Sequence, residues 1–100
     1  MGSLGLASDP ASPIAQLGGL FGYAASKTAL NAFTLRLANE LRDKRFKVNA
    51  ACPGYVATDL NRHSGPRSVE QGAEIIVRLA TLPDDGPTGG FFDEAGPVPW

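Results

Sequence analysis

The sequence has little of what builds disulfide-linked, metal-binding or membrane proteins. Among its 100 residues there is one cysteine, Cys52, and one histidine, His63. A single cysteine excludes an internal disulfide framework, and one cysteine with one histidine argues against a structural zinc site. No run approaches the roughly 20 apolar residues that span a bilayer, and no basic segment followed by an apolar run opens the chain. These absences predict a soluble, cytoplasmic protein with no metal and no membrane partner.

The chain also has no excess of charge of either sign. Nine Lys and Arg residues are balanced by ten Asp and Glu residues, and 43% of the chain is hydrophobic. A basic face that could neutralise phosphates is therefore not indicated, which argues against a nucleic-acid partner. The composition is typical of a folded domain rather than of a disordered segment. At this length only about 60 to 65% of the unfolded surface is buried on folding, so we expect a modest core.

The first half of the chain divides into a loop and a helix. Residues 1–22 are rich in Gly, Ser, Ala and Pro and show no period, so we expect a long loop. Residues 23–44 contain good helix formers, and apolar side chains recur at steps of three and four. The spacing predicts an amphipathic helix whose apolar face carries Leu30, Phe33, Leu37 and Leu41.

The second half predicts two strands separated by a helix. Residues 46–52 form a short apolar run that Pro53 and Gly54 end, and residues 55–67 are a polar loop. Ser68 followed by Gln71 is a capping-box pattern, and helical spacing of apolar residues continues until Pro83. Phe91 and Phe92 form a further short strand candidate. We expect His63 to be solvated, Cys52 to pack in the strand, and Trp100 to anchor the C-terminus, shape a substrate pocket or form a subunit contact.

The order helix, strand, helix, strand favours an α/β fold, because strands joined through a helix pair most readily in parallel. Two parallel strands alone make a poor independent unit, since parallel sheets are normally covered on both faces and have more neighbours. We therefore interpret residues 1–100 as one partial domain, the C-terminal part of a doubly wound parallel sheet.

Tyr23 and Lys27 are the most suggestive pair for chemistry. Side chains four residues apart on a helix lie on the same face and can reach a common ligand. A tyrosine hydroxyl has a pKa of about 10 in solution, and a nearby ammonium favours its ionised form. Such a pair suits proton exchange with a substrate hydroxyl or carbonyl, although the same spacing also occurs by chance on solvated helices.

Two motifs in the right order change this weighing. Residues 23–27 read Tyr-Ala-Ala-Ser-Lys, and residues 48–58 read Val-Asn-Ala-Ala-Cys-Pro-Gly-Tyr-Val-Ala-Thr. The chain thereby resembles the short-chain dehydrogenase/reductase family, whose active-site helix begins Tyr-x-Ala-Ser-Lys and whose next strand runs from Val-Asn into Pro-Gly-x-Val-x-Thr. The resemblance extends to the glycines and phenylalanines of residues 89–92 and to the terminal Trp100, as in some carbonyl-reductase-like members.

The resemblance implies a Rossmann-like fold and a nicotinamide-dependent oxidoreductase that acts on a small carbonyl or alcohol substrate. It implies that Tyr23 is the general acid or base and that Lys27 assists it and holds the nicotinamide ribose. It further implies that residues 53–58 line the nicotinamide pocket, through Pro53, Gly54, Val56 and Thr58. The cofactor would be NADP or NAD, with NADP favoured by the likeness to carbonyl reductases, and the helix at residues 23–44 would form a homo-oligomer.

The chain departs from the family pattern in two places. The family's glycine-rich turn between its first strand and helix, which cradles the pyrophosphate, is not in this sequence. The family's catalytic serine lies about a dozen residues before the tyrosine, and we expect it upstream of Met1, with Ser3, Ser8 and Ser12 as substitutes. The simplest expectation is a chain that begins at an internal methionine of a longer enzyme and that is inactive alone. The alternative is a non-catalytic interaction module that pairs through the helix.

Overall fold

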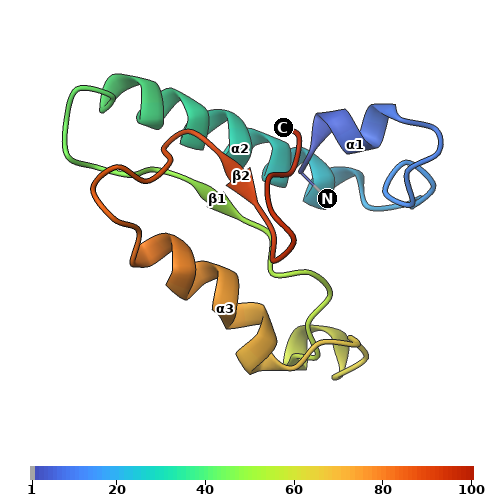
Figure 1. Cartoon of the computed structure of the whole chain (residues 1–100). Helices are drawn as coiled ribbons and strands as arrows, with labels where there is room; N and C mark the ends of the chain where they lie inside the picture. Colours follow the sequence, from blue (N-terminus) through green and yellow to red (C-terminus); the bar gives the residue numbers. More distant parts are fainter. Residues whose placement is uncertain (1) are drawn as a thin grey trace.

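The computed structural model describes residues 2–100 and has an α/β architecture (Figure 1). Its elements follow the order helix, helix, strand, 3-10 helix, helix, strand. Their bounds are α1 Leu4–Ser8, α2 Phe21–Glu40, β1 Ala50–Ala51, η1 Asp59–Asn61, α3 Val69–Ala80 and β2 Phe91–Phe92. The predicted order of the four main elements, α2, β1, α3 and β2, is confirmed.

The two strands pair in parallel, as predicted, with Ala50 opposite Phe91 and Ala51 opposite Phe92. The strand predicted over residues 46–52 is much shorter than expected, because its first half makes one backbone bond to the neighbouring chain, from the Gly89 amide to the Val48 carbonyl at 2.8 Å, and is otherwise held by side-chain bonds. The Val48 amide donates to the Thr88 hydroxyl at 3.0 Å, and the Asn49 side-chain amide donates to the Pro87 carbonyl at 3.0 Å. The segment before β1 is thus held in place without being a strand.

The sheet lies between α2 on one face and α3 on the other (Figure 1). The α2 side packs closely on the segment before β2, where a Cβ added to Gly89 would lie 3.6 Å from the Cβ of Ala38. On the other side α3 contacts β1. The buried hydrophobic residues are Ala38, Ile75 and Phe91, so the core is small.

The α2 helix starts two residues earlier and ends four residues earlier than the predicted range of 23–44. The predicted strip of Leu30, Phe33, Leu37 and Leu41 is not the buried side of the helix. Leu30 and Phe33 are 53% and 65% exposed, whereas Thr34 and Ala38 form the buried side. Small side chains are buried there because the helix approaches the backbone around Gly89 closely, which leaves the bulky side chains pointing outward.

The α3 helix begins as the sequence predicts. The Gln71 amide donates to the Ser68 hydroxyl at 3.2 Å, and the Ser68 amide donates to the Gln71 side-chain oxygen at 2.8 Å. This reciprocal capping box satisfies two amide groups that the helix itself leaves without partners. The helix ends at Ala80, three residues before Pro83, because the residue that precedes a proline is disfavoured in helical conformation.

The expectation of loop over residues 1–22 is wrong in part, because α1 lies within this range and α2 begins at Phe21. Ser3 caps α1 by accepting a hydrogen bond from the Leu6 amide at 3.0 Å, and it donates to the Pro99 carbonyl at 2.5 Å. The Gly5 amide donates to the Trp100 carbonyl at 2.6 Å. The N-terminal segment is therefore hydrogen-bonded to the C-terminal residues, and these bonds hold α1 in place.

Trp100 is an anchor of the C-terminal segment. Its ring stacks on that of Phe91, with centroids 5.5 Å apart and planes inclined by 27°. The Val98 amide donates to the Phe91 carbonyl at 2.8 Å, so the chain folds back along β2 after a turn. Of the helices in residues 2–100, none is both long enough and apolar enough to cross a membrane.

Candidate active site

Tyr23 and Lys27 lie on the first two turns of α2, on the same side of the helix. The Lys27 Nζ is 5.5 Å from the centroid of the Tyr23 ring. This is within the range of a cation–π contact, which at exposed sites stabilises by about 0.5–1 kcal/mol. Tyr23 is 47% exposed and Lys27 is exposed, so both groups are accessible to a ligand.

The N-terminal segment packs directly against this part of α2. A Cβ on Gly2 would lie 2.8 Å from the carbonyl carbon and oxygen of Lys27, so glycine permits the close approach. The Thr28 hydroxyl donates to the Gly2 carbonyl at 3.2 Å. The backbone beneath Lys27 is thereby fixed by contacts that do not involve its ammonium group.

The second group of predicted residues lies in the segment that follows β1. Figure 1 shows the chain leaving the end of α2, turning back and entering β1, so the segment after β1 reaches the end of the fold at which α2 begins. Pro53 is half-buried, and Gly54 has a φ of 77°, a conformation that glycine adopts without steric cost. This antiparallel arrangement of helix and strand brings both sequence motifs to one end of the molecule.

The loop over residues 55–67 closes on itself. The Ala57 amide donates to the Arg67 carbonyl at 2.9 Å, and the Arg67 amide donates to the Tyr55 carbonyl at 3.3 Å. Val56 is the residue bridged to Arg67 in parallel. In such a bridge the central residue directs its own N–H and C=O away from its partner. The Val56 backbone groups therefore point away from Arg67.

Asn61 orders the interior of this loop, a role that the sequence reasoning missed. Its side chain donates to the Val56 carbonyl at 2.7 Å and accepts a hydrogen bond from the Thr58 amide at 3.1 Å. The Thr58 hydroxyl in turn accepts a hydrogen bond from the Asn61 amide, which completes a capping box at η1. A Thr followed three residues later by Asn is a form of this motif and could have indicated it.

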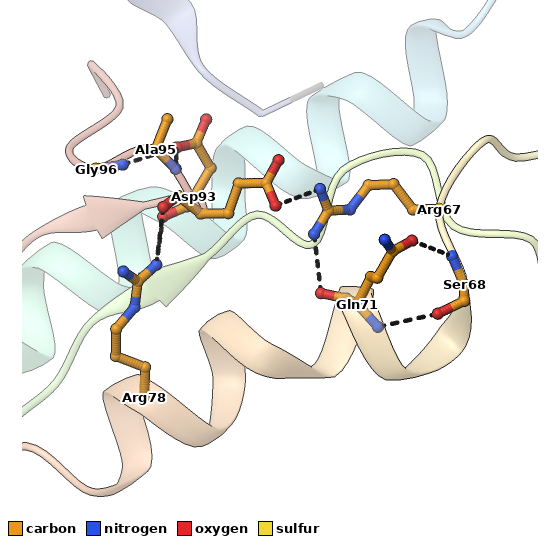
Figure 2. Close-up of polar contacts among 8 residues, drawn as sticks. Arg67, Ser68, Gln71, Arg78, Asp93, Ala95 and Gly96 are labelled. Carbon is orange, nitrogen blue, oxygen red and sulfur yellow. Dashed lines mark hydrogen bonds and ion pairs between the residues drawn. The ribbon is translucent and has the colours of Figure 1, made fainter.

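The role of Arg67 was also missed, because no pattern in the neighbouring sequence indicates which residues it contacts. Its Nη1 lies 2.5 Å from Glu94 Oε2, and its Nη2 donates to the Gln71 carbonyl at 2.8 Å (Figure 2). The Arg67 side chain also packs against Gly54, where an added Cβ would lie only 2.7 Å from Arg67 Cδ. Arg67 thus contacts the motif after β1, the start of α3 and the C-terminal segment.

The three substitute serines are each used locally. Ser3 caps α1, the Ser8 hydroxyl donates to the Gly5 carbonyl at 3.0 Å, and the Ser12 hydroxyl accepts from the Ile14 amide at 3.2 Å. Ser3 and Ser12 are buried, with 3% and 7% of their surface exposed. Within residues 2–100, none of the three hydroxyl groups is hydrogen-bonded to Tyr23 or Lys27.

His63 and Cys52 do not form a reactive centre. The His63 Nε2 pairs with the Asp59 carboxylate at 2.8 Å on the surface of the loop, and both side chains are exposed. Exposed pairs of this kind contribute little to stability. Cys52 is half-buried with a free thiol. Among the described residues, no three His, Cys, Asp or Glu side chains gather in a way that could hold a metal ion.

Two hollows of the surface lie away from the predicted residues. One, of about 250 Å³, lies between β1 and α3, and the residues that line it are Lys47, Asn49, Ala51, Ile76, Leu79 and Ala80. Another, of about 430 Å³, is lined by Glu74, Arg78 and Glu94. Tyr23, Lys27 and the residues after β1 line neither hollow.

A family model described as short chain dehydrogenase matches residues 12–68, more than half of the chain. The matched range includes every predicted site residue: Tyr23, Lys27, Pro53, Gly54, Val56 and Thr58. Among curated proteins, salutaridine reductase of Papaver somniferum is 49% identical over 71 residues, which cover 71% of this chain and 22% of the relative. Carbonyl reductase [NADPH] 3 of Rattus norvegicus is 46% identical over 67 residues, which cover 63% of this chain and 24% of the relative.

Solved structures give the same likeness at the level of the fold. The carbonyl reductase Sniffer of D. melanogaster superposes with a TM-score of 0.73 and 32% identity, covering 95% of this chain and 38% of that one. Salutaridine reductase from Papaver somniferum superposes with a TM-score of 0.65, covering 72% of this chain and 24% of that one. The chain spans about a quarter or less of the length of these curated relatives.

Proposed function

Because the chain belongs to the short-chain dehydrogenase family, we propose that Tyr23 and Lys27 are the proton-transfer pair of an oxidoreductase acting on a small carbonyl or alcohol. The observation that carries the proposal is the position of the Lys27 ammonium 5.5 Å from the centroid of the Tyr23 ring, with both side chains accessible. In the direction of reduction Tyr23 donates its hydroxyl proton to the carbonyl oxygen, and in oxidation it accepts one. The Lys27 ammonium stabilises the negative charge that develops on the Tyr23 oxygen.

The residues present fit the nicotinamide end of a dinucleotide cofactor, which would supply or accept the hydride. An ammonium group at Lys27 can donate to ribose hydroxyls. In the segment after β1, the Val56 backbone groups point away from Arg67. The Val56 carbonyl already accepts a hydrogen bond from the Asn61 side chain at 2.7 Å. The Val56 amide is therefore the group offered to the carboxamide, with the Thr58 hydroxyl, which accepts within its cap and can still donate.

NADP is the proposed form of the cofactor. This choice is supported by the curated relative whose name includes NADPH, carbonyl reductase [NADPH] 3 of Rattus norvegicus. Relatives named as reductases of salutaridine and of (-)-isopiperitenone, the latter 51% identical over 67 residues, favour a carbonyl substrate.

A homo-oligomer formed through α2 is part of the same proposal, and it is also the form that a purely non-catalytic interaction module would take. The supporting observation is the exposure of the bulky side chains on the helix, 53% for Leu30 and 65% for Phe33. Exposed apolar side chains grouped on one surface mark contact sites more often than free surface.

The catalytic role of Tyr23 is tested in a chimera in which this chain replaces the matching segment of salutaridine reductase. We expect Tyr23→Phe to lower kcat for salutaridine by at least about 100-fold, because a positioned acid contributes roughly 10²–10⁴ to the rate. Thr81→Val is the control. It removes a hydroxyl that donates to the Val77 carbonyl at 2.8 Å and should leave kcat within a few-fold. Equal rates for the Tyr23→Phe chimera and its parent would show that another group is the acid.

A further inference from the structure

Arg67 connects three segments that are distant in the sequence, at the base of the loop over residues 55–67. Its backbone closes that loop through the Ala57 amide at 2.9 Å and the Tyr55 carbonyl at 3.3 Å. Its side chain reaches back under Gly54, where a Cβ would lie only 2.7 Å from Arg67 Cδ. One residue therefore holds both ends of the loop and supports the turn from which the loop leaves β1.

The guanidinium group is fixed by two partners in different elements. Nη1 pairs with Glu94 Oε2 at 2.5 Å, and Nη2 donates to the Gln71 carbonyl at 2.8 Å (Figure 2). The side chain of Arg67 is only 19% exposed, which shields this pair from water more than an ordinary surface pair. The hydrogen bond that Arg67 donates to Glu94 raises the pKa of Arg67 above its ordinary value, so the group stays charged.

Glu94 is itself held in place by its own turn. The Asp93 carboxylate accepts hydrogen bonds from the Ala95 amide at 2.8 Å and the Gly96 amide at 3.1 Å. From α3, Arg78 donates to the carbonyls of Asp93 and Glu94 at 3.1 and 3.2 Å (Figure 2). The C-terminal turn is thus an ordered support to which Arg67 is tied.

Resting on the function proposed above, we propose that Arg67 is a positioning residue, which sets the Val56 amide and the Thr58 hydroxyl for the nicotinamide by tying their loop to Glu94. Without this tie the loop keeps its internal bonds through Asn61 but loses its fixed orientation relative to β1. Affinity for a ligand falls in proportion to the fraction of molecules in the competent arrangement. The residue acts through the loop and does not itself touch the reacting atoms.

The test compares Arg67→Met with Arg78→Met in this chain, because Arg78 binds the same C-terminal turn but does not contact the loop. We expect Arg67→Met to weaken NADPH binding by about tenfold, and to speed hydrogen exchange of the Ala57 amide by a similar factor. Arg67→Lys keeps the charge but cannot form both bonds of the fork, so it should recover part of the affinity. Arg78→Met should change neither quantity by more than about twofold, even where it lowers the unfolding temperature.

Glu94→Gln gives the same test with less risk to folding, since it removes the charge of a half-exposed partner and keeps its shape. A loss of NADPH affinity in the Arg67 and Glu94 variants no larger than in Arg78→Met, or an unchanged exchange rate of the Ala57 amide in Arg67→Met, would overturn the positioning role. If the unmodified chain does not bind NADPH, the proposed function fails instead. The Ala57 exchange rates then still decide whether Arg67 orders the loop.

Discussion

At the residue scale, glycines determine how closely segments approach in the loop after β1. A Cβ on Gly65 would lie 2.5 Å from both the Tyr55 oxygen and the Val56 carbonyl carbon, which are backbone atoms that cannot move aside independently. On α2, by contrast, a Cβ on Gly22 would meet nothing within 4 Å. The same substitution should therefore have opposite effects at the two sites.

We predict that Gly65→Ala lowers the free energy of unfolding by about 1–3 kcal/mol, the usual cost of forcing an extra methyl group into a packed site. Gly22→Ala should raise it by up to about 1 kcal/mol, because alanine is the better helix former. Chemical denaturation of the two variants measures both values. Equal effects at the two sites would show that the loop does not close against Gly65.

Chemistry that depends on local spacing could be predicted at this scale, whereas chemistry that depends on distant contacts could not. Tyr23 and Lys27 follow from a four-residue step on a helix, and the Ser68 cap follows from a three-residue pattern. The pairing of Arg67 with Glu94 joins residues 27 positions apart, and only the fold of the C-terminal turn brings them together. The closed loop around Asn61 likewise needed the structure to be recognised.

At the scale of elements, α2 differs most from its prediction. Periodicity predicted an apolar strip that includes Leu30 and Phe33, but both are exposed in the structure, and the small side chains of Thr34 and Ala38 are buried instead. A period of three to four residues shows that a helix has an apolar side. It does not show whether that side or the neighbouring strip of small residues packs against the sheet. The length of the strand before Pro53 was overestimated, since only Ala50 and Ala51 of its apolar run are paired with the neighbouring strand.

We predict that the outward side of α2 drives self-association. Phe33→Glu should lower the mass seen by sedimentation at micromolar concentration, because it places a charge in the proposed contact. Phe46→Glu is the matched control, since Phe46 is 63% exposed in the turn after α2 and Phe33 is 65% exposed. A chain that is monomeric before either substitution, or that responds equally to both, would contradict a contact through α2.

At the scale of the whole molecule, the chain exposes more surface than its mass requires. Its accessible area is 7109 Å², whereas a folded monomer of this mass exposes about 5,400 Å². The excess of about 1,700 Å² is more than the roughly 800 Å² that one partner buries in a standard interface. The radius of gyration of 14.4 Å likewise exceeds the approximately 13 Å typical of 100 residues.

This open shape agrees with the prediction that a two-stranded parallel sheet has too few neighbours to form a stable independent unit. The fold class and the parallel pairing could be predicted because they depend on the order of elements. The amount of exposed surface could not, because it depends on which side chains face the sheet. A nicotinamide site on so open a surface should bind through few contacts, and Lys27 should account for a large share of them.

The most direct test of the proposed site is thermal unfolding of the purified chain with and without millimolar NADPH. A ligand that binds the folded state at about ten times its Kd stabilises it by about 1.4 kcal/mol, which raises the midpoint by several degrees in a domain of this size. We predict such a rise for the unmodified chain and for Lys44→Met, which removes an ammonium group beyond the far end of α2, and its loss in Lys27→Met. No rise in the unmodified chain, or an equal rise in Lys27→Met, would contradict a nicotinamide site at Tyr23 and Lys27.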